Sequence, residues 1–157
     1  MALMTRSGKP DFGILLLLAD QEFVRALRAA TSDQGFDDQG RSDGFVLRTL
    51  GAGPRTITGL AERLEITKQG ASQIVDDMER RGYVERRPDP GDARARLLHL
   101  TERGEAALAA ARKFHQSYER RLRRKFGDDA IDTLRGVLTE MAGEAQVSTP
   151  HFRALMF

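Results

Sequence analysis

The sequence predicts a mainly helical protein with one small β-hairpin near its middle. Apolar residues recur at helical spacing over most of the chain, whereas residues 83–101 alternate between apolar and polar side chains as strands do. Glycine or proline follows several of the helical stretches and indicates where they end. A chain of 157 residues, 40% of them hydrophobic, can bury a sizeable core as one compact unit or as a small two-lobed one.

The composition excludes several kinds of site. The chain has no cysteine, which rules out disulfides, thiolate zinc sites, iron–sulfur clusters and a cysteine redox switch. It has no tryptophan, and aromatic residues make up only 6%, which argues against a base-stacking surface for single strands. The longest apolar run, from Ile14 to Ala19, is far shorter than the roughly 20 residues that span a membrane. We therefore expect a cytoplasmic protein without a membrane segment or a cofactor.

The first expected helix covers residues 10–31. Its apolar face consists of residues three or four positions apart, namely Phe12, Leu16, Ala19, Phe23 and Leu27. Residues 32–41 are polar and contain glycine, which predicts a loop. Ser42 is expected to cap a short helix that carries Phe45, and Gly51 and Pro54 mark its end.

Two further helices follow in quick succession. Thr58 is the expected N-cap of a helix over residues 59–64, and Thr67 that of a longer helix over residues 68–81. Gly82 ends the second of them. The strands are expected at 83–88 and 95–101, on either side of a turn-forming tip.

The last third of the chain predicts two long helices. The first, at residues 102–126, begins after Thr101 and ends at Gly127, and the second covers residues 128–146. Each carries an apolar stripe that must be buried against something. The tail from His151 to Phe157 is apolar as well, so we expect it to pack on another surface.

Residues 58–81 have the layout that places a helix in the major groove of DNA. In this layout the first helix lies behind the second and is joined to it by a tight turn. The second helix then presents its outer face to the bases. Here that outer face carries polar side chains that suit base edges and phosphates: Lys68, Gln69, Ser72 and Gln73. We assign these four and Thr67 to DNA binding. The alternative is an ordinary amphipathic helix with a solvated face.

The hairpin adds four arginines beside this helix. Arg94 lies at the tip, flanked on the strands by Arg86, Arg87 and Arg96. A narrow minor groove attracts arginine, and we expect Asp92 to hold the Arg94 guanidinium in position. We add Arg86, Asp92, Arg94 and Arg96 to the expected DNA-binding residues. The alternative is a surface hairpin with scattered charges.

The stretch from Ile57 to Gly104 resembles the winged helix-turn-helix core of the MarR family of bacterial transcriptional regulators. The matching positions are Leu60-Ala61, Leu64, Gly82, Val84, Arg86, Asp89-Pro90, Asp92, Arg94, Leu100-Thr101 and Gly104. The chain departs from the family pattern at Glu65, Gly70, Gln73 and Ala93, and these changes bear on affinity and target sequence.

The resemblance implies three parts and a regulatory role. Residues 1–41 are expected to form an N-terminal dimerisation helix and loop, residues 42–101 the winged DNA-binding domain, and residues 102–157 the C-terminal dimerisation helices and tail. A homodimer would then bind a pseudo-palindromic operator in double-stranded DNA, and we expect a repressor. Packing of the terminal helices within one chain is the alternative to the dimer.

The resemblance also implies release by a small, often aromatic anion. The residues expected to bind it are Phe45, Phe114 and His115. The basic run from Arg120 to Lys125 has two interpretations, a contact to flanking DNA or a solvated helix end.

Two other classes of protein are considered beside the regulator. An enzyme is disfavoured because His99, His115 and His151 are far apart and no nucleophile elbow or phosphate-binding loop is present. The other class is a winged-helix interaction module with weak or no affinity for DNA, which the departures from the family pattern leave open.

Overall fold

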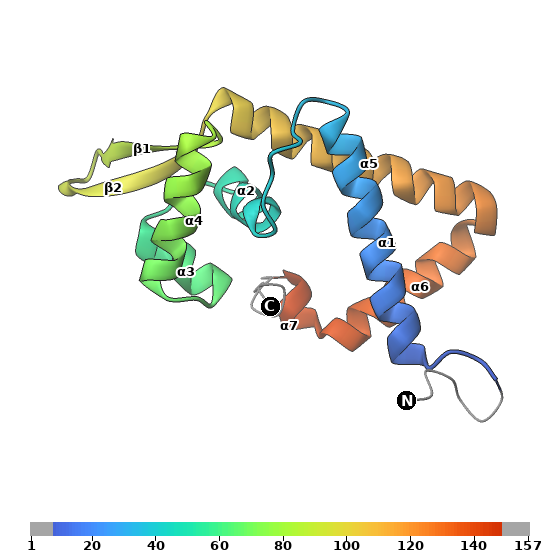
Figure 1. The fold of residues 1–157 in the computed structure, drawn as a ribbon. Helices are drawn as coiled ribbons and strands as arrows, with labels where there is room; N and C mark the ends of the chain where they lie inside the picture. Colours follow the sequence, from blue (N-terminus) through green and yellow to red (C-terminus); the bar gives the residue numbers. More distant parts are fainter. Residues whose placement is uncertain (1–7, 149–157) are drawn as a thin grey trace.

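The computed structural model describes residues 8–148 and confirms a mainly helical fold with a two-stranded antiparallel wing (Figure 1). The elements in chain order are α1 (Phe12–Ser32), α2 (Asp43–Gly51), α3 (Ile57–Leu64), α4 (Lys68–Arg80), β1 (Val84–Asp89), β2 (Asp92–Leu100), α5 (Glu102–Phe126), α6 (Asp128–Ala142) and α7 (Glu144–Ser148). Two lobes are visible. The winged lobe (α2, α3, α4, β1 and β2) lies at one end of α5, and the helical lobe (α1, α6, α7 and the second half of α5) at the other.

The winged lobe is built around a single apolar core. Leu47, Leu60, Val75 and Tyr83 are each at most 2% exposed, and Leu108 at the start of α5 packs against the same cluster. Burying an aliphatic or aromatic side chain fully stabilises a fold by roughly 1.5–3 kcal/mol. This core therefore fixes the angle at which α3 and α4 meet.

The wing is longer toward its tip than the alternation in the sequence predicts. Val84 pairs with Leu100 at the base, and Asp89 pairs with Asp92 at the tip. The Asp89 carboxylate accepts a hydrogen bond of 2.8 Å from the backbone N–H of Gly91, which tightens the turn and lets the strands continue almost to it. A short bridge from Arg55 to Leu98 adds a third segment at the base.

The N-caps are a partial correction to the sequence analysis. Thr67 and Thr101 cap α4 and α5 as expected, but α3 begins after Thr56 rather than Thr58. Thr56 has extended backbone angles and accepts a hydrogen bond of 3.1 Å from the N–H of Gly59. Ser42 makes no side-chain cap to α2. The neighbouring Asp43 instead accepts a bond of 2.8 Å from the N–H of Gly40.

Two positions show why the chain needs or lacks glycine. A Cβ at Gly104 would lie 2.1 Å from the carbonyl oxygen of Tyr83, so only glycine allows α5 to start this close to the wing. Glu65, in the turn between α3 and α4, has a positive φ of 50°. A left-handed backbone costs a non-glycine residue roughly 1–2 kcal/mol, so this turn stores strain.

The helical lobe differs from the expectation at its end. The predicted helix over residues 128–146 is broken at Gly143, whose φ is 84°, into α6 and α7. The apolar tail from His151 to Phe157 lies outside the described residues. Within residues 8–148, every helix is too short or too polar to cross a membrane.

Candidate nucleic-acid interface

Helix α4 separates its apolar and polar residues onto opposite sides. Ala71, Val75 and Met78 are buried against the core, whereas Lys68 and Gln73 are exposed. Gln69 is also exposed, and Ser72 is half-buried. The side chains assigned to base and phosphate contacts therefore lie together on the free side of the helix, as a recognition helix requires.

The first turn of α4 is shaped by Thr67. Its hydroxyl accepts a hydrogen bond of 3.0 Å from the N–H of Gly70, which leaves other N–H groups of the first turn unpaired within the helix. Free N–H groups at a helix N-terminus favour phosphate binding. A Cβ at Gly70 would lie 3.2 Å from the Thr67 hydroxyl oxygen, so glycine keeps this cap uncrowded.

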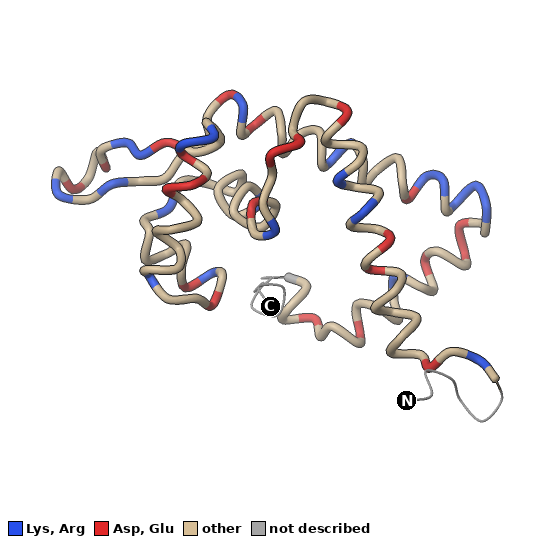
Figure 2. The backbone as a smooth tube through the Cα atoms, viewed as in Figure 1, with Lys and Arg blue, Asp and Glu red and all other residues tan. Residues whose placement is uncertain are grey.

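The wing brings basic side chains to the same end of the molecule. Figure 2 shows Lys and Arg residues along both strands and at the tip. Arg94 and Arg96 are exposed, and neither forms an ion pair with a residue in the range 8–148. Two arginines at the wing are thus available for a polyanion.

The role expected for Asp92 needs correction. Its carboxylate accepts a hydrogen bond of 2.9 Å from the backbone N–H of Arg94 and makes no ion pair with the guanidinium in the described structure. Asp side chains commonly accept a hydrogen bond from the backbone N–H two residues ahead, and this local bond competes with the expected contact between the carboxylate and the guanidinium. Asp92 shapes the tip, and the Arg94 side chain is left to extend from it.

Arg86 does not share the exposure of Arg94 and Arg96. Its Nη2 lies 2.6 Å from Oδ1 of Asp76, and its Nη1 pairs with Glu79, so it links β1 to α4. Arg87, one residue on, pairs with Glu85 and is 56% exposed.

A buried ion pair behind α4 was not predicted from the sequence. Asp43 is 2% exposed, and its carboxylate lies 2.5 Å from Nη1 of Arg81. Nη2 of the same arginine lies 2.5 Å from Asp77. The pair joins the first turn of α2 to the end of α4. The residues are separated by 38 positions, so no local pattern could have revealed the pairing.

A second network holds the loop before α2. The hydroxyl of Tyr83 donates to Asp38, and the Arg103 guanidinium lies 4.7 Å from the centre of the Tyr83 ring. Burial and the bond to Asp38 raise the pKa of Tyr83 to about 12. The same bond lowers the pKa of Asp38.

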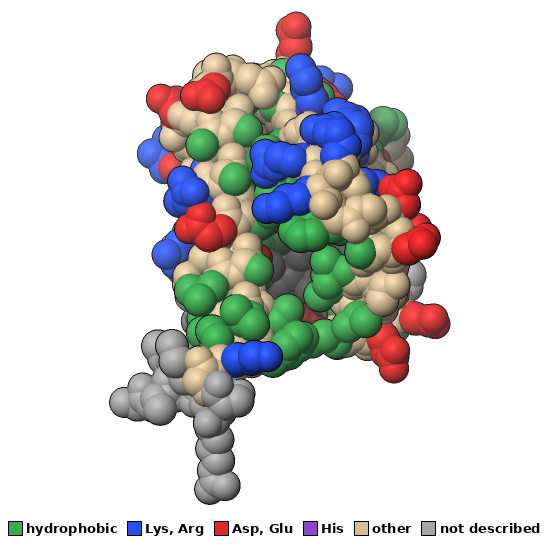
Figure 3. All heavy atoms as spheres, turned by 90° about the vertical axis from the view of Figure 1, so that its right-hand side faces the viewer, with side chains coloured by type: hydrophobic (Ala, Val, Ile, Leu, Met, Phe, Trp, Pro, Cys, Tyr) green, Lys and Arg blue, Asp and Glu red, His purple; other side chains and the backbone are tan. Residues whose placement is uncertain are grey.

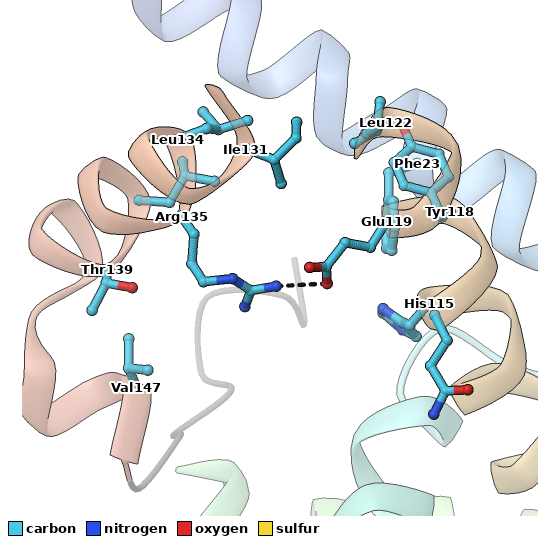
Figure 4. Close-up of a pocket in the computed structure, with 12 residues that line it drawn as sticks. Phe23, His115, Tyr118, Glu119, Leu122, Ile131, Leu134, Arg135, Thr139 and Val147 are labelled. Carbon is cyan, nitrogen blue, oxygen red and sulfur yellow. Dashed lines mark hydrogen bonds and ion pairs between the residues drawn. The ribbon is translucent and has the colours of Figure 1, made fainter. Parts of the chain in front are cut away.

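A cavity of about 530 Å³ lies in the helical lobe, between α1, α5, α6 and α7 (Figure 4). Its lining is apolar apart from a few groups, and Arg135 of α6 donates across it to Glu119 of α5 at 2.6 Å. His115 lines the cavity, and its Nε2 lies 2.7 Å from Nη2 of Arg48 on α2. Partial burial and the Arg48 charge lower the pKa of His115.

The three residues expected to bind an effector are only partly brought together. Phe114 and His115 join Phe23 and Tyr118 in a cluster of rings with centres 4.9–6.1 Å apart. Phe45 packs against the core of the winged lobe. Among the described residues that line the cavity, His115 is present and neither Phe45 nor Phe114 is. Phe23 was not expected at this site, because its helical spacing alone marked it as core.

Similarity to known proteins connects this geometry to a family. A profile of the MarR family matches residues 40–95. Over 157 aligned residues, the chain is 30% identical to the HTH-type transcriptional regulator PetP of Rhodobacter capsulatus, and the match covers 90% of this chain and 93% of PetP. The chain belongs to the MarR family. The resemblance found in the sequence is confirmed, and the protein is a DNA-binding transcriptional regulator of a non-enzymatic family.

Two solved structures similar to this one contain DNA. The transcriptional repressor CouR, bound to a 23-mer duplex, is 29% identical with a TM-score of 0.64, and the match covers 85% of this chain and 93% of CouR. A mutant MarR from E. coli complexed with operator DNA is 25% identical, also with a TM-score of 0.64. That match covers 83% of this chain and 93% of the E. coli protein.

Proposed function

We propose that this MarR-family regulator is a repressor that binds a pseudo-palindromic operator as a homodimer. Residues 42–101 form the DNA-binding domain, and residues 1–41 and 102–157 supply the dimer contacts. The observation that carries the proposal is the polar outer face of α4 beside a wing whose Arg94 and Arg96 are exposed and form no ion pair with residues 8–148. The presence of a duplex in the CouR and E. coli MarR structures supports it.

The DNA contacts follow from the charges and exposure described above. Helix α4 enters the major groove with Gln69, Ser72 and Gln73 toward the bases, while Lys68 and the helix N-terminus at Thr67 meet phosphate. The wing lies along the neighbouring minor groove with Arg94 and Arg96, and Asp92 maintains the turn.

The dimer is supported by apolar side chains that the described chain leaves uncovered. Phe12 and Leu18 on α1 are 62% and 49% exposed, and Val137 and Met141 on α6 are 45% and 53% exposed. Figure 3 shows hydrophobic side chains gathered around a hollow on this face of the helical lobe. An exposed apolar surface of this kind marks an interaction site, and a second copy offers the complementary one.

An aromatic anion fits the junction between the lobes as the effector. Burial lowers the pKa of Arg48, and repulsion from the nearby Arg112 charge lowers it further. An anion beside Arg48 and His115 would relieve this repulsion, while Phe23 and Phe114 offer a ring surface. Because Arg48 belongs to the winged lobe and His115 to α5, binding here changes the angle between the lobes.

The DNA-binding part is tested by titrating a duplex with the protein at several salt concentrations. For a regulator of this kind, the logarithm of the binding constant falls with the logarithm of the salt concentration, with a slope near −0.9 for each phosphate contacted. Arg94→Ala makes this slope shallower and lowers the affinity for most duplexes alike. Arg120→Ala, at the far end of α5, is the matched control and leaves both unchanged if the basic run is a solvated helix end. A parent protein that shows no salt dependence would instead be an interaction module.

The effector part has a separate test with benzoate as the simplest aromatic anion. Millimolar benzoate should raise the melting temperature of the parent protein and weaken its binding to duplex DNA. Arg48→Ala should abolish both effects, whereas benzyl alcohol, which has the ring without the charge, should have neither effect on the parent. Equal responses to the two compounds would contradict an anion site.

A further inference from the structure

The arginines of the wing fall into two classes. Arg94 and Arg96 extend into solvent, whereas the Arg86 side chain is only 30% exposed and contacts two carboxylates. Both carboxylates belong to α4, at positions ten and seven residues earlier in the chain. Arg86 therefore joins the recognition helix to the first strand of the wing.

The local charge makes Arg86 a poor site for phosphate. Asp76 and Glu79 together carry two negative charges against the single positive charge of Arg86. A phosphate close enough to bind this guanidinium would also approach both carboxylates. The three side chains together carry a net charge of −1, so the two carboxylates offset the attraction between Arg86 and a phosphate.

The Arg55–Leu98 bridge supports the base of the wing on the β2 side, and beyond it the wing is a two-stranded ribbon. An isolated pair of strands is marginally stable and twists easily. Val84, Leu98 and Leu100 anchor the base of the ribbon in the core, and Arg86, which pairs with Leu98, is the next inward residue of β1 toward the tip. A guanidinium that holds two carboxylates in fixed directions sets the angle between β1 and α4.

We propose that Arg86 is a positioning residue that fixes the wing against the recognition helix and does not contact DNA. The inference rests on the proposed DNA-binding function. In this proposal, the Arg86–Asp76–Glu79 cluster sets the distance between the base-reading side chains of α4 and Arg94 at the wing tip. It also replaces our sequence-based expectation that Arg86 binds DNA.

The decisive variant keeps Arg86 and removes its partners. Asp76→Asn combined with Glu79→Gln is nearly isosteric and makes each protomer more positive by two charges. If Arg86 positions the wing, this double variant binds the duplex selected by the parent from a random pool about tenfold more weakly. If Arg86 is a phosphate contact, the same variant binds more tightly, because it removes repulsion and releases the guanidinium.

Arg86→Ala provides the second arm. We expect a similar loss of affinity for the selected duplex, with the salt slope on a generic duplex unchanged. A salt slope that becomes shallower by about 0.9 would overturn the proposal, since it would show that Arg86 neutralises a phosphate. The triple variant should bind the selected duplex no more weakly than Arg86→Ala or the double variant, because the same link is broken in all three. Additive losses would contradict a shared role.

Two controls separate this result from other failures. Glu85→Gln releases Arg87 without cutting the link to α4, so it should not weaken binding. Thermal unfolding of every variant checks that the fold is retained, and Asp76→Asn alone should give an intermediate loss in affinity if the double variant is unstable. A parent protein that binds no duplex would disprove the proposed function, whereas tighter binding by the double variant would disprove only the role of Arg86.

Discussion

The two lobes of this protein differ in how completely they bury their apolar residues. In the winged lobe, Leu47, Leu60 and Val75 are at most 2% exposed. In the helical lobe, Phe12 and Leu138 remain 62% and 43% exposed although they lie on equally regular helices. The comparison teaches that the winged lobe completes its core within one chain, whereas the helical lobe presents an apolar surface that a second copy can cover.

The largest effect is expected from a charge placed on this uncovered surface. Leu18→Glu should raise the dimer dissociation constant about a thousandfold. Each protomer loses about 1 kcal/mol of burial from a leucine that is 49% exposed in the single chain, and the carboxylate placed in the interface costs about 1 kcal/mol more. Analytical ultracentrifugation over a range of concentrations measures this constant. Gln21→Glu adds the same charge at an exposed polar position of α1 and should change the constant little. Equal effects of the two substitutions would place the dimer contact elsewhere.

The next effect concerns the winged lobe alone. Asp43→Asn leaves Arg81 without its buried partner and should lower the free energy of unfolding by about 3 kcal/mol, measured in urea. Asp37→Asn, at an exposed position of the preceding loop, is the control and should cost under about 0.5 kcal/mol. A small cost at Asp43 would mean that water replaces the ion pair.

A pH effect connects the two lobes and should be smaller. The fold lowers the pKa of His115 below its usual 6.5, so the unfolded chain binds this proton more readily than the folded one. The contribution of His115 to stability is therefore present above pH 6.5 and is lost as the pH falls through the folded pKa. Unfolding measured at pH 7.5 and 5.5 should show this loss in the parent and less of it in His115→Gln. An identical pH dependence in the two proteins would argue against the partial burial of His115 beside Arg48.

The smallest effect tests the strained turn. Glu65→Gly should raise the free energy of unfolding by about 0.5–1 kcal/mol, because glycine adopts the left-handed backbone without strain. The same substitution at Glu62, inside α3, should lower it by about 1 kcal/mol. Destabilisation by both substitutions would show that the Glu65 side chain contributes more than its backbone costs.

The features that the sequence predicted well are those with a local signature. Helices α3 and α4 and the wing were found because the period of apolar residues and the turn residues lie within a few positions of one another. The cap at Thr56 was missed by two residues, since Thr58 offers the same hydroxyl chemistry two positions later. The break at Gly143 was missed because the apolar stripe continues past it.

The side-chain pairs of the site had no such signature. Asp43 and Arg81 are 38 positions apart, and either residue alone resembles a surface charge in the sequence. In the sequence Arg86 resembled Arg94, because both are arginines at matching positions of the family pattern in the wing. Only the positions of Asp76 and Glu79 in the fold distinguish them. Burial and ion pairing depend on the assembled fold, so arginines with similar sequence contexts make different contacts.

Hydroxyl-radical footprinting on the duplex selected from a random pool tests the account most directly. Two copies bound with α4 in successive major grooves should give two protected regions about one helical turn apart, related by a two-fold axis, with two protomers per duplex. A single protected half-site occupied by one protomer would contradict the account.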